Sequence, residues 1–96
     1  MLPEYEEALT KYSVGRDLLS ALLIHRELLL QELERLSRIP QHVTGIIVDF
    51  DYRRSLSITL SLAKISLDLH DLVEQINKQA AVCGMPPVHV ANLGVN

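Results

Sequence analysis

The sequence predicts a mainly α protein: a helical hairpin of two long antiparallel helices, joined by an extended or short β segment, in one domain over residues 1–96. The first observation is composition, which is 48% hydrophobic but only 4% aromatic, a combination common in leucine-rich helical bundles. The second is that segments 17–38 and 53–82 carry apolar residues at the helical period. The third is that helix-stop signals follow both segments, at Pro40 and at Gly84.

The first helix is expected to begin near Pro3, because proline is tolerated in the first turn and the glutamates that follow favour the positive end of the helix dipole. It can falter at Ser13-Val14-Gly15, where a serine cap and a glycine occur together. From residue 17 it runs to Arg38. Its outer face comprises Asp17, Ser20, Glu27, Gln31, Glu34 and Arg35, and its inner face comprises Leu18, Leu19, Leu22, Leu29, Leu30, Leu33 and Leu36.

The connection contains a short β-branched run at residues 45–50, which predicts a buried extended segment or strand. The alternative is that the second helix already begins there, although glycine followed by β-branched residues makes a poor first turn. Asp51 suits the N-cap of a helix that begins at about Arg53. The mildly apolar tail, residues 88–95, is expected to pair with residues 45–50 as a minor two-stranded ribbon.

The stretch 53–78 can be read with the period of a strand or with that of a helix, but only the helical period continues through the whole stretch. Residues 56–62 alternate between apolar and polar like a half-buried strand, but the alternation slips at Ala63-Lys64. At about 100° per residue a polar stripe runs on for five turns. The helix predicts that Ile58 and Ser66 are buried, while Ser57 and Asp68 are exposed. The polar stripe comprises Ser57, Ser61, Lys64, Asp68, Asp71 and Gln75.

Two apolar stripes share this helix, separated by the small or polar residues Ser55, Thr59, Ser66 and His70. A lone hairpin supplies only one partner, so the sequence predicts a dimeric helical bundle of coiled-coil type. The alternative is that the ribbon or the N-terminal turn covers one stripe. The narrow stripe is Leu56, Leu60, Ala63 and Leu67. The broad stripe is Ile58, Leu62, Ile65, Leu69, Leu72, Val73 and Ile76. The candidate interface residues are Leu56, Leu60, Ala63, Leu67, Ile58, Leu62, Ile65 and Leu69.

Arg26 falls near the centre of the inner face of the first helix, and His25 lies at its edge. An unpaired buried guanidinium would be costly. Its stem therefore covers apolar surface while its head reaches solvent or a salt bridge, or the residue anchors a partner. In an antiparallel hairpin His70 is expected within about one turn of His25. Arg26, His25 and His70 are thus the candidate polar anchor, and the pocket that a small enzyme would use.

The remaining histidines, the aspartates and the cysteine give weaker indications of function. The histidines form no HxxxH or ExxH pattern, so no metal or cofactor is expected. Asp49 and Asp51 flank Phe50, but no second catalytic group accompanies them, so no catalytic residue is expected. Cys83 follows the C-terminal end of a helix, where the dipole does not favour a thiolate, and is interpreted as structural.

The charge and hydropathy of the chain argue against some classes of function. The net charge is −3 and Arg53-Arg54 is the only adjacent basic pair, which argues against a nucleic-acid partner. No apolar run approaches the ~20 residues that a membrane span needs. An acidic N-terminus unlike a signal peptide and a single cysteine favour a cytoplasmic location.

The sequence therefore predicts a protein-interaction module. It would be a small helical homodimer that acts as an adaptor, chaperone or inhibitor of another, unidentified protein, through its apolar stripes or its acidic N-terminal turn. One alternative is a small enzyme with the pocket described above. The other is a nucleic-acid-associated regulator that uses Arg53, Arg54 and Lys64.

Overall fold

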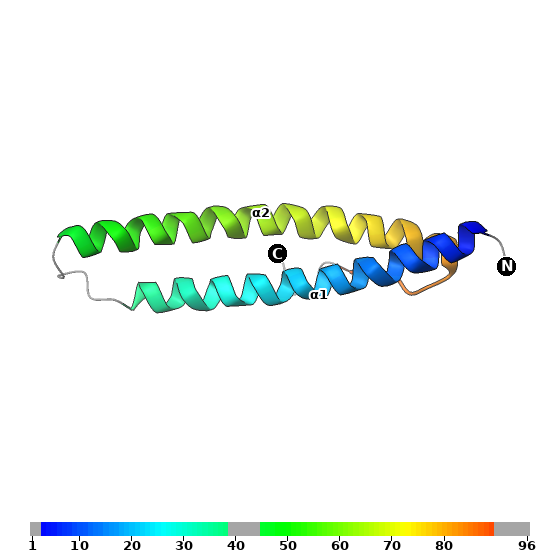
Figure 1. Ribbon diagram of the computed structural model, residues 1–96, viewed down its shortest axis with the longest axis horizontal. Coiled ribbons are helices and arrows are strands. Elements are labelled where there is room, and N and C mark those ends of the chain that lie inside the picture. Colours follow the sequence, from blue (N-terminus) through cyan, green and yellow to red (C-terminus); the bar gives the residue numbers. More distant parts are fainter. Residues whose placement is uncertain (1–2, 39–44, 90–96) are drawn as a thin grey trace.

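The computed structural model describes the backbone of residues 3–38 and 45–89, and the side chains of residues 3–38 and 52–89. It contains two helices, α1 (Pro3–Ser37) and α2 (Gly45–Cys83), followed by an extended tail. The helices lie antiparallel and side by side, and they form a rod of 66 × 20 × 15 Å (Figure 1). The predicted helical hairpin is thereby confirmed.

The start of α2 corrects the expected connection. Residues 45–50 are helical and belong to α2, so the predicted strand is wrong and the alternative of an early helix start holds. Asp51 consequently lies inside the helix and is not its N-cap. Isoleucine and valine are less favourable than alanine in a helix by only some tenths of a kcal/mol, which a long helix easily absorbs.

The expected ribbon is wrong for the same reason, because its first strand is a helix. Residues 85–89 of the tail are not a strand either, and residues 90–95 lie outside the described part of the chain. A strand needs a second strand to which it can hydrogen-bond, and the described residues contain no strand.

α1 is continuous through Ser13-Val14-Gly15, so the expected interruption is wrong. Gly15 is buried against α2, and a Cβ atom built on it would lie 2.7 Å from Cγ1 of Ile76. The glycine permits a close approach of the two helices and does not break the first one.

The core is a seam between the helices. From α2 it takes the broad stripe, of which Ile58, Ile65 and Leu69 are buried and Leu62 is half-buried. The expected exposure of Ser57 and burial of Ile58 are confirmed, whereas Ser66 and Asp68 are both half-buried at the edges of the seam. From α1 and the tail the core takes Ala8, Tyr12, Leu19, Leu36 and Val88.

The two expected faces of α1 are largely confirmed. All residues of the outer face are exposed. On the inner face Leu19 and Leu36 are buried and the other leucines are half-buried, except Leu18, which is 53% exposed. Leu18 therefore lies outside the seam that the helical pattern assigned to it.

The tail folds back onto the helices after a helix end that the sequence predicts correctly. Gly84 has a φ of 71°, and the N–H of Met85 donates to the carbonyl of Ala80 at 3.1 Å, as in a Schellman motif. The amide of Asn77 then holds both backbone groups of Val88, donating to its oxygen at 2.9 Å and accepting from its N–H at 2.8 Å. Val88 is buried as a result.

Candidate interaction surface

The eight interface residues that the sequence singles out separate into two sets. Those of the broad stripe face α1, so they form the seam within the hairpin. Those of the narrow stripe face solvent: Leu56 is 48% exposed, Leu60 64% and Leu67 68%, and Ala63 is also exposed. The narrow stripe is the part of the prediction that the hairpin leaves without a partner.

The narrow stripe lies on the side of α2 that faces away from α1, because at about 100° per residue it falls roughly 150° around the helix from the buried seam. Its members are spaced four, three and four residues apart, which is the spacing of a coiled-coil seam. Tyr52, four residues before Leu56, is 67% exposed and extends the same face. The surface therefore has the pattern that packs against another helix.

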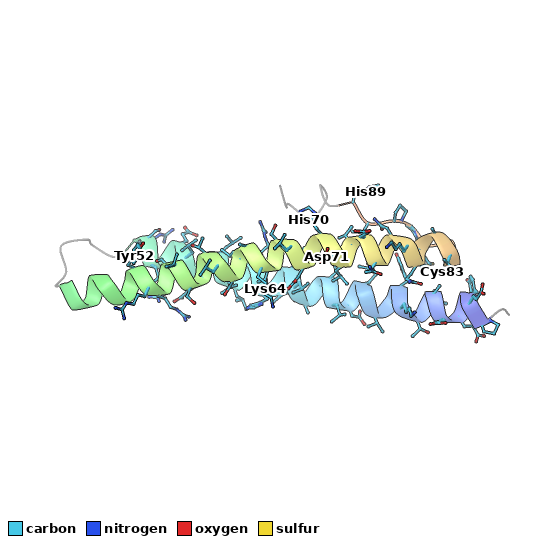
Figure 2. All side chains as sticks on the ribbon, turned by 90° about the horizontal axis from the view of Figure 1, so that it is seen from above. Tyr52, Lys64, His70, Asp71, Cys83 and His89 are labelled. Carbon is cyan, nitrogen blue, oxygen red and sulfur yellow. The ribbon has the colours of Figure 1, made fainter. Side chains whose placement is uncertain are left out.

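Charged residues flank this surface. Figure 2 looks onto the side of α2 away from α1, where Lys64 and His70 lie towards opposite edges. Arg53, Lys64 and Asp71 are all exposed. The Thr59 hydroxyl donates to the carbonyl of Ser55 at 2.8 Å, so its proton is used within the helix. The narrow stripe thus has an apolar centre and a mixed-charge margin.

A second apolar surface is a shallow groove between the two helices. One part, of about 410 Å³, is lined by Val14, Gly15 and Leu18 of α1 and by Leu72 of α2, among others. A neighbouring part of about 400 Å³ shares Leu18 and Leu72 and has Asp68, Asp71 and Gln75 at its rim. The sequence pattern missed this groove because it assigned Leu18 to the core.

Farther along α1, Ile24 and Leu28 are 63% and 59% exposed. Apolar surface therefore continues on α1 towards the connection between the helices.

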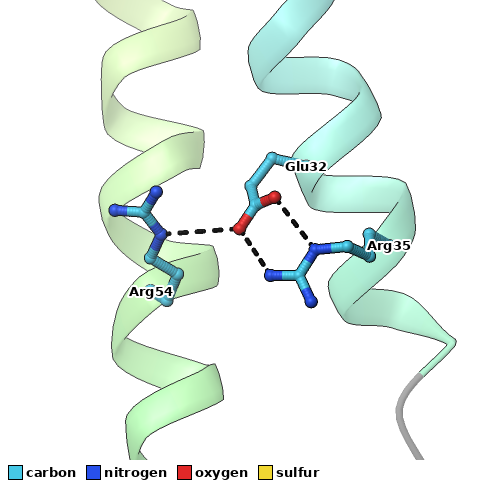
Figure 3. A network of polar contacts seen from close by, with 3 residues as sticks. All are labelled: Glu32, Arg35 and Arg54. Carbon is cyan, nitrogen blue, oxygen red and sulfur yellow. Dashed lines mark hydrogen bonds and ion pairs between the residues drawn. The ribbon is translucent and has the colours of Figure 1, made fainter.

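A charged network joins the helices near that connection (Figure 3). Arg35 contacts Glu32 through two atoms, at 2.7 Å from Nη2 and 3.0 Å from Nε, and Nε of Arg54 lies 3.8 Å from the same carboxylate. Hydrogen bonding from Arg35 lowers the pKa of Glu32, and the positive charges of Arg35 and Arg54 act in the same direction. The Glu32 side chain is 27% exposed and the arginines more so, so the network is a surface feature of small stabilising effect.

The candidate polar anchor is not assembled by the hairpin. Arg26 is half-buried, as its place on the inner face predicts, and has no hydrogen-bond or ion-pair partner among the described residues. His25 lies seven residues after Leu18, on the groove side, whereas His70 lies seven residues before Asn77, on the side where the tail packs. Both histidines are exposed, so these three residues line no common pocket.

The described residues contain no group of three or more His, Cys, Asp or Glu side chains placed to hold a metal ion. Cys83 is a free, buried thiol within the core cluster, which agrees with its interpretation as structural. Within the same part of the chain, neither helix has an apolar stretch of the length and hydropathy that crossing a lipid bilayer requires.

Comparisons of the chain with protein-family models, with curated proteins and with solved structures found no match.

Proposed function

We propose that the protein is a protein-interaction module: a helical homodimer that binds another protein as an adaptor, chaperone or inhibitor. The observation that carries this proposal is the narrow stripe of Leu56, Leu60, Ala63 and Leu67, exposed on the side of α2 that α1 does not cover. An aligned row of exposed apolar side chains at coiled-coil spacing is a surface for another helix, whereas scattered single leucines would need no explanation.

The total surface of the chain supports association. Its accessible surface is 7036 Å², about 1,500 Å² more than a compact monomer of 10.8 kDa exposes. Its radius of gyration is 18.5 Å, against about 12–13 Å for a compact domain of this length. A standard interface buries about 800 Å² on each subunit, so one such interface would remove roughly half of the excess.

The groove supports a separate partner. Pairing through the narrow stripe leaves Val14, Leu18 and Leu72 accessible, because they lie on another side of the hairpin. Apolar grooves between helices bind the apolar face of an amphipathic helix. Because Asp68 lies at the rim, a partner helix with basic residues beside its apolar face would fit the groove best.

Sedimentation equilibrium at micromolar concentration tests the homodimer. The wild-type chain should sediment at about twice its 10.8 kDa mass. Leu60→Glu places a charge on the narrow stripe and should give a folded monomer, because Leu60 is 64% exposed and takes no part in the seam. The matched control is Ser57→Glu, on the polar stripe, which should remain a dimer. A wild-type monomer with unchanged helicity would contradict the proposal.

Affinity capture separates groove-dependent binding from background. Proteins retained by wild-type bait and lost with Leu18→Glu bait use the groove, while those retained by both do not. Leu18 is 53% exposed, so this substitution should leave the hairpin folded.

A further inference from the structure

We infer that two copies of the chain pair α2 against α2 in antiparallel orientation, with a twofold axis that crosses the narrow stripe between Leu60 and Ala63. This inference rests on the proposed homodimer and specifies its geometry. Steric complementarity, the flanking charges and closure of the assembly each favour this arrangement.

The steric argument comes from the order of the four residues. Spacings of four, three and four read the same in both directions, so an antiparallel copy sets Leu56 opposite Leu67 and Leu60 opposite Ala63. Each central contact then pairs a large side chain with a small one, and it occurs twice because of the twofold axis. A parallel pair would set Ala63 opposite its own copy and leave a gap at the centre, which packing disfavours.

The charges on one flank agree with the antiparallel orientation. Arg53 and Asp71 are 18 residues apart, which is five full turns, so they lie on the same flank of α2. An antiparallel twofold pair brings equal flanks together, and an axis between Leu60 and Ala63 places Arg53 of one copy within about 2 Å, along the helix axis, of the level of Asp71 of the other. Both residues are exposed, and the contact would form twice. A parallel pair would place this flank of the two copies on opposite sides of the interface, so Arg53 and Asp71 could not meet.

Closure of the assembly favours pairing of the two narrow stripes with each other over docking of one stripe into the groove of the next molecule. Docking the narrow stripe into the groove at Leu18 of another copy would leave a free groove on one copy and a free stripe on the other, so chains would continue to add. The antiparallel pair uses both stripes and closes at two copies. From Arg53 to Asp71 the paired surface would run for about 27 Å of helix.

Disulfide cross-linking tests the geometry in the full chain. Leu56→Cys and Leu67→Cys are made separately, and the native Cys83 is retained because it is buried. The two variants carry tags of different size, are unfolded and refolded together, and are then oxidised briefly. The antiparallel pair should give the mixed cross-link at least ten times faster than either variant alone, because residue 56 lies about 16 Å along the helix from its own copy. Gln75→Cys, exposed and off the stripe, is the control that should not cross-link.

The outcomes separate the inference from the function on which it rests. Rapid cross-linking of each variant with itself would show a parallel dimer, which overturns the inference and leaves the homodimer intact. A mixed cross-link between Leu60→Cys and Ile24→Cys would show head-to-tail docking onto α1 and would also overturn it. A dimer that cross-links at none of these positions has another interface, with the same consequence. A monomer in sedimentation overturns both proposals.

Charge exchange provides an independent measurement. Asp71→Arg and Arg53→Glu should each weaken dimerisation several-fold, and the double variant should recover the wild-type dissociation constant. Arg53 has a contact within its own chain, so the double-mutant cycle is needed to isolate the contact between copies. Additive weakening in the double variant would contradict the antiparallel pairing.

Discussion

At Gly15 the backbone of α1 lies so near Ile76 that any side chain would collide with it. The Cβ of an alanine would lie 2.7 Å from Cγ1 of Ile76, whose β-branched side chain is only 1% exposed and has little freedom to move. Replacing glycine by alanine within a helix ordinarily gains about 0.8–1 kcal/mol. Overpacking a core costs about 1–3 kcal/mol, so the collision should outweigh the gain.

We expect Gly15→Ala to lower the free energy of unfolding by up to about 2 kcal/mol in urea denaturation. Ile76→Ala removes the colliding atom, and in that background the same substitution should be neutral or stabilising. If Gly15→Ala stabilised the wild-type chain, the helices could not approach at this position as described.

Arg26 is half-buried on the face of α1 that meets α2. Arg26→Met keeps the apolar stem and removes the charge, so the melting temperature should hold or rise. Binding of a captured partner should be unchanged if the stem only covers apolar surface. A loss of about 2 kcal/mol in binding with an intact fold would instead make Arg26 the anchor for a partner carboxylate. A clearly lower melting temperature would contradict both interpretations.

Along α2, neighbouring residues differ sharply in burial. Ile58 is 2% exposed while Ser57 is exposed. Ile58→Asp should therefore cost more than ~3 kcal/mol or prevent folding, because an unpaired carboxylate would be buried in the seam. Ser57→Asp should be nearly neutral. Leu62 is only half-buried, so Leu62→Asp should cost less than Ile58→Asp. Equal damage from Ser57→Asp and Ile58→Asp in urea denaturation would rule out the helical register.

The tail is attached to the helices by a few polar contacts. The Tyr12 hydroxyl donates to the carbonyl of Pro86 at 3.1 Å, and the Asn77 amide holds Val88. Val88 belongs to the same core cluster as Cys83, a residue that is only 6% exposed. The tail thus closes one end of the seam, near the start of α1.

We expect Asn77→Ala to release the tail, lowering the free energy of unfolding by about 1–3 kcal/mol and speeding the reaction of Cys83 with a thiol reagent. Gln75→Ala is the matched control, because this amide is exposed and lies at the rim of the groove. Unchanged thiol reactivity in Asn77→Ala would mean that the tail does not cover this end of the core.

The whole molecule is a rod, and its shape makes dimer geometries distinguishable in solution. A monomeric Leu60→Glu chain should have a radius of gyration near 18.5 Å in small-angle scattering. Side-by-side pairing with helices about 10 Å apart should raise this only to about 21–22 Å. End-to-end association would give more than about 30 Å. A wild-type dimer of that larger size would contradict pairing along α2.

Local patterns in the sequence determined much of the hairpin. The 3.6-residue period, the acidic first turn and the glycine and prolines after Cys83 act within a turn or two, so they identify both helices and where α2 ends. The two stripes of α2 and the polar stripe follow from the same period. Each of these patterns can be recognised because it depends only on residues that are neighbours along one helix.

Tertiary structure decided how the two helices meet. Their relative rotation and offset depend on the sum of contacts along the whole seam, which no local pattern encodes. That geometry makes Gly15 a contact point, leaves Leu18 in a groove and places His25 and His70 on different sides. It also selects the broad stripe for burial against α1, because a single neighbouring helix can cover only one side of α2. The narrow stripe is exposed for that reason.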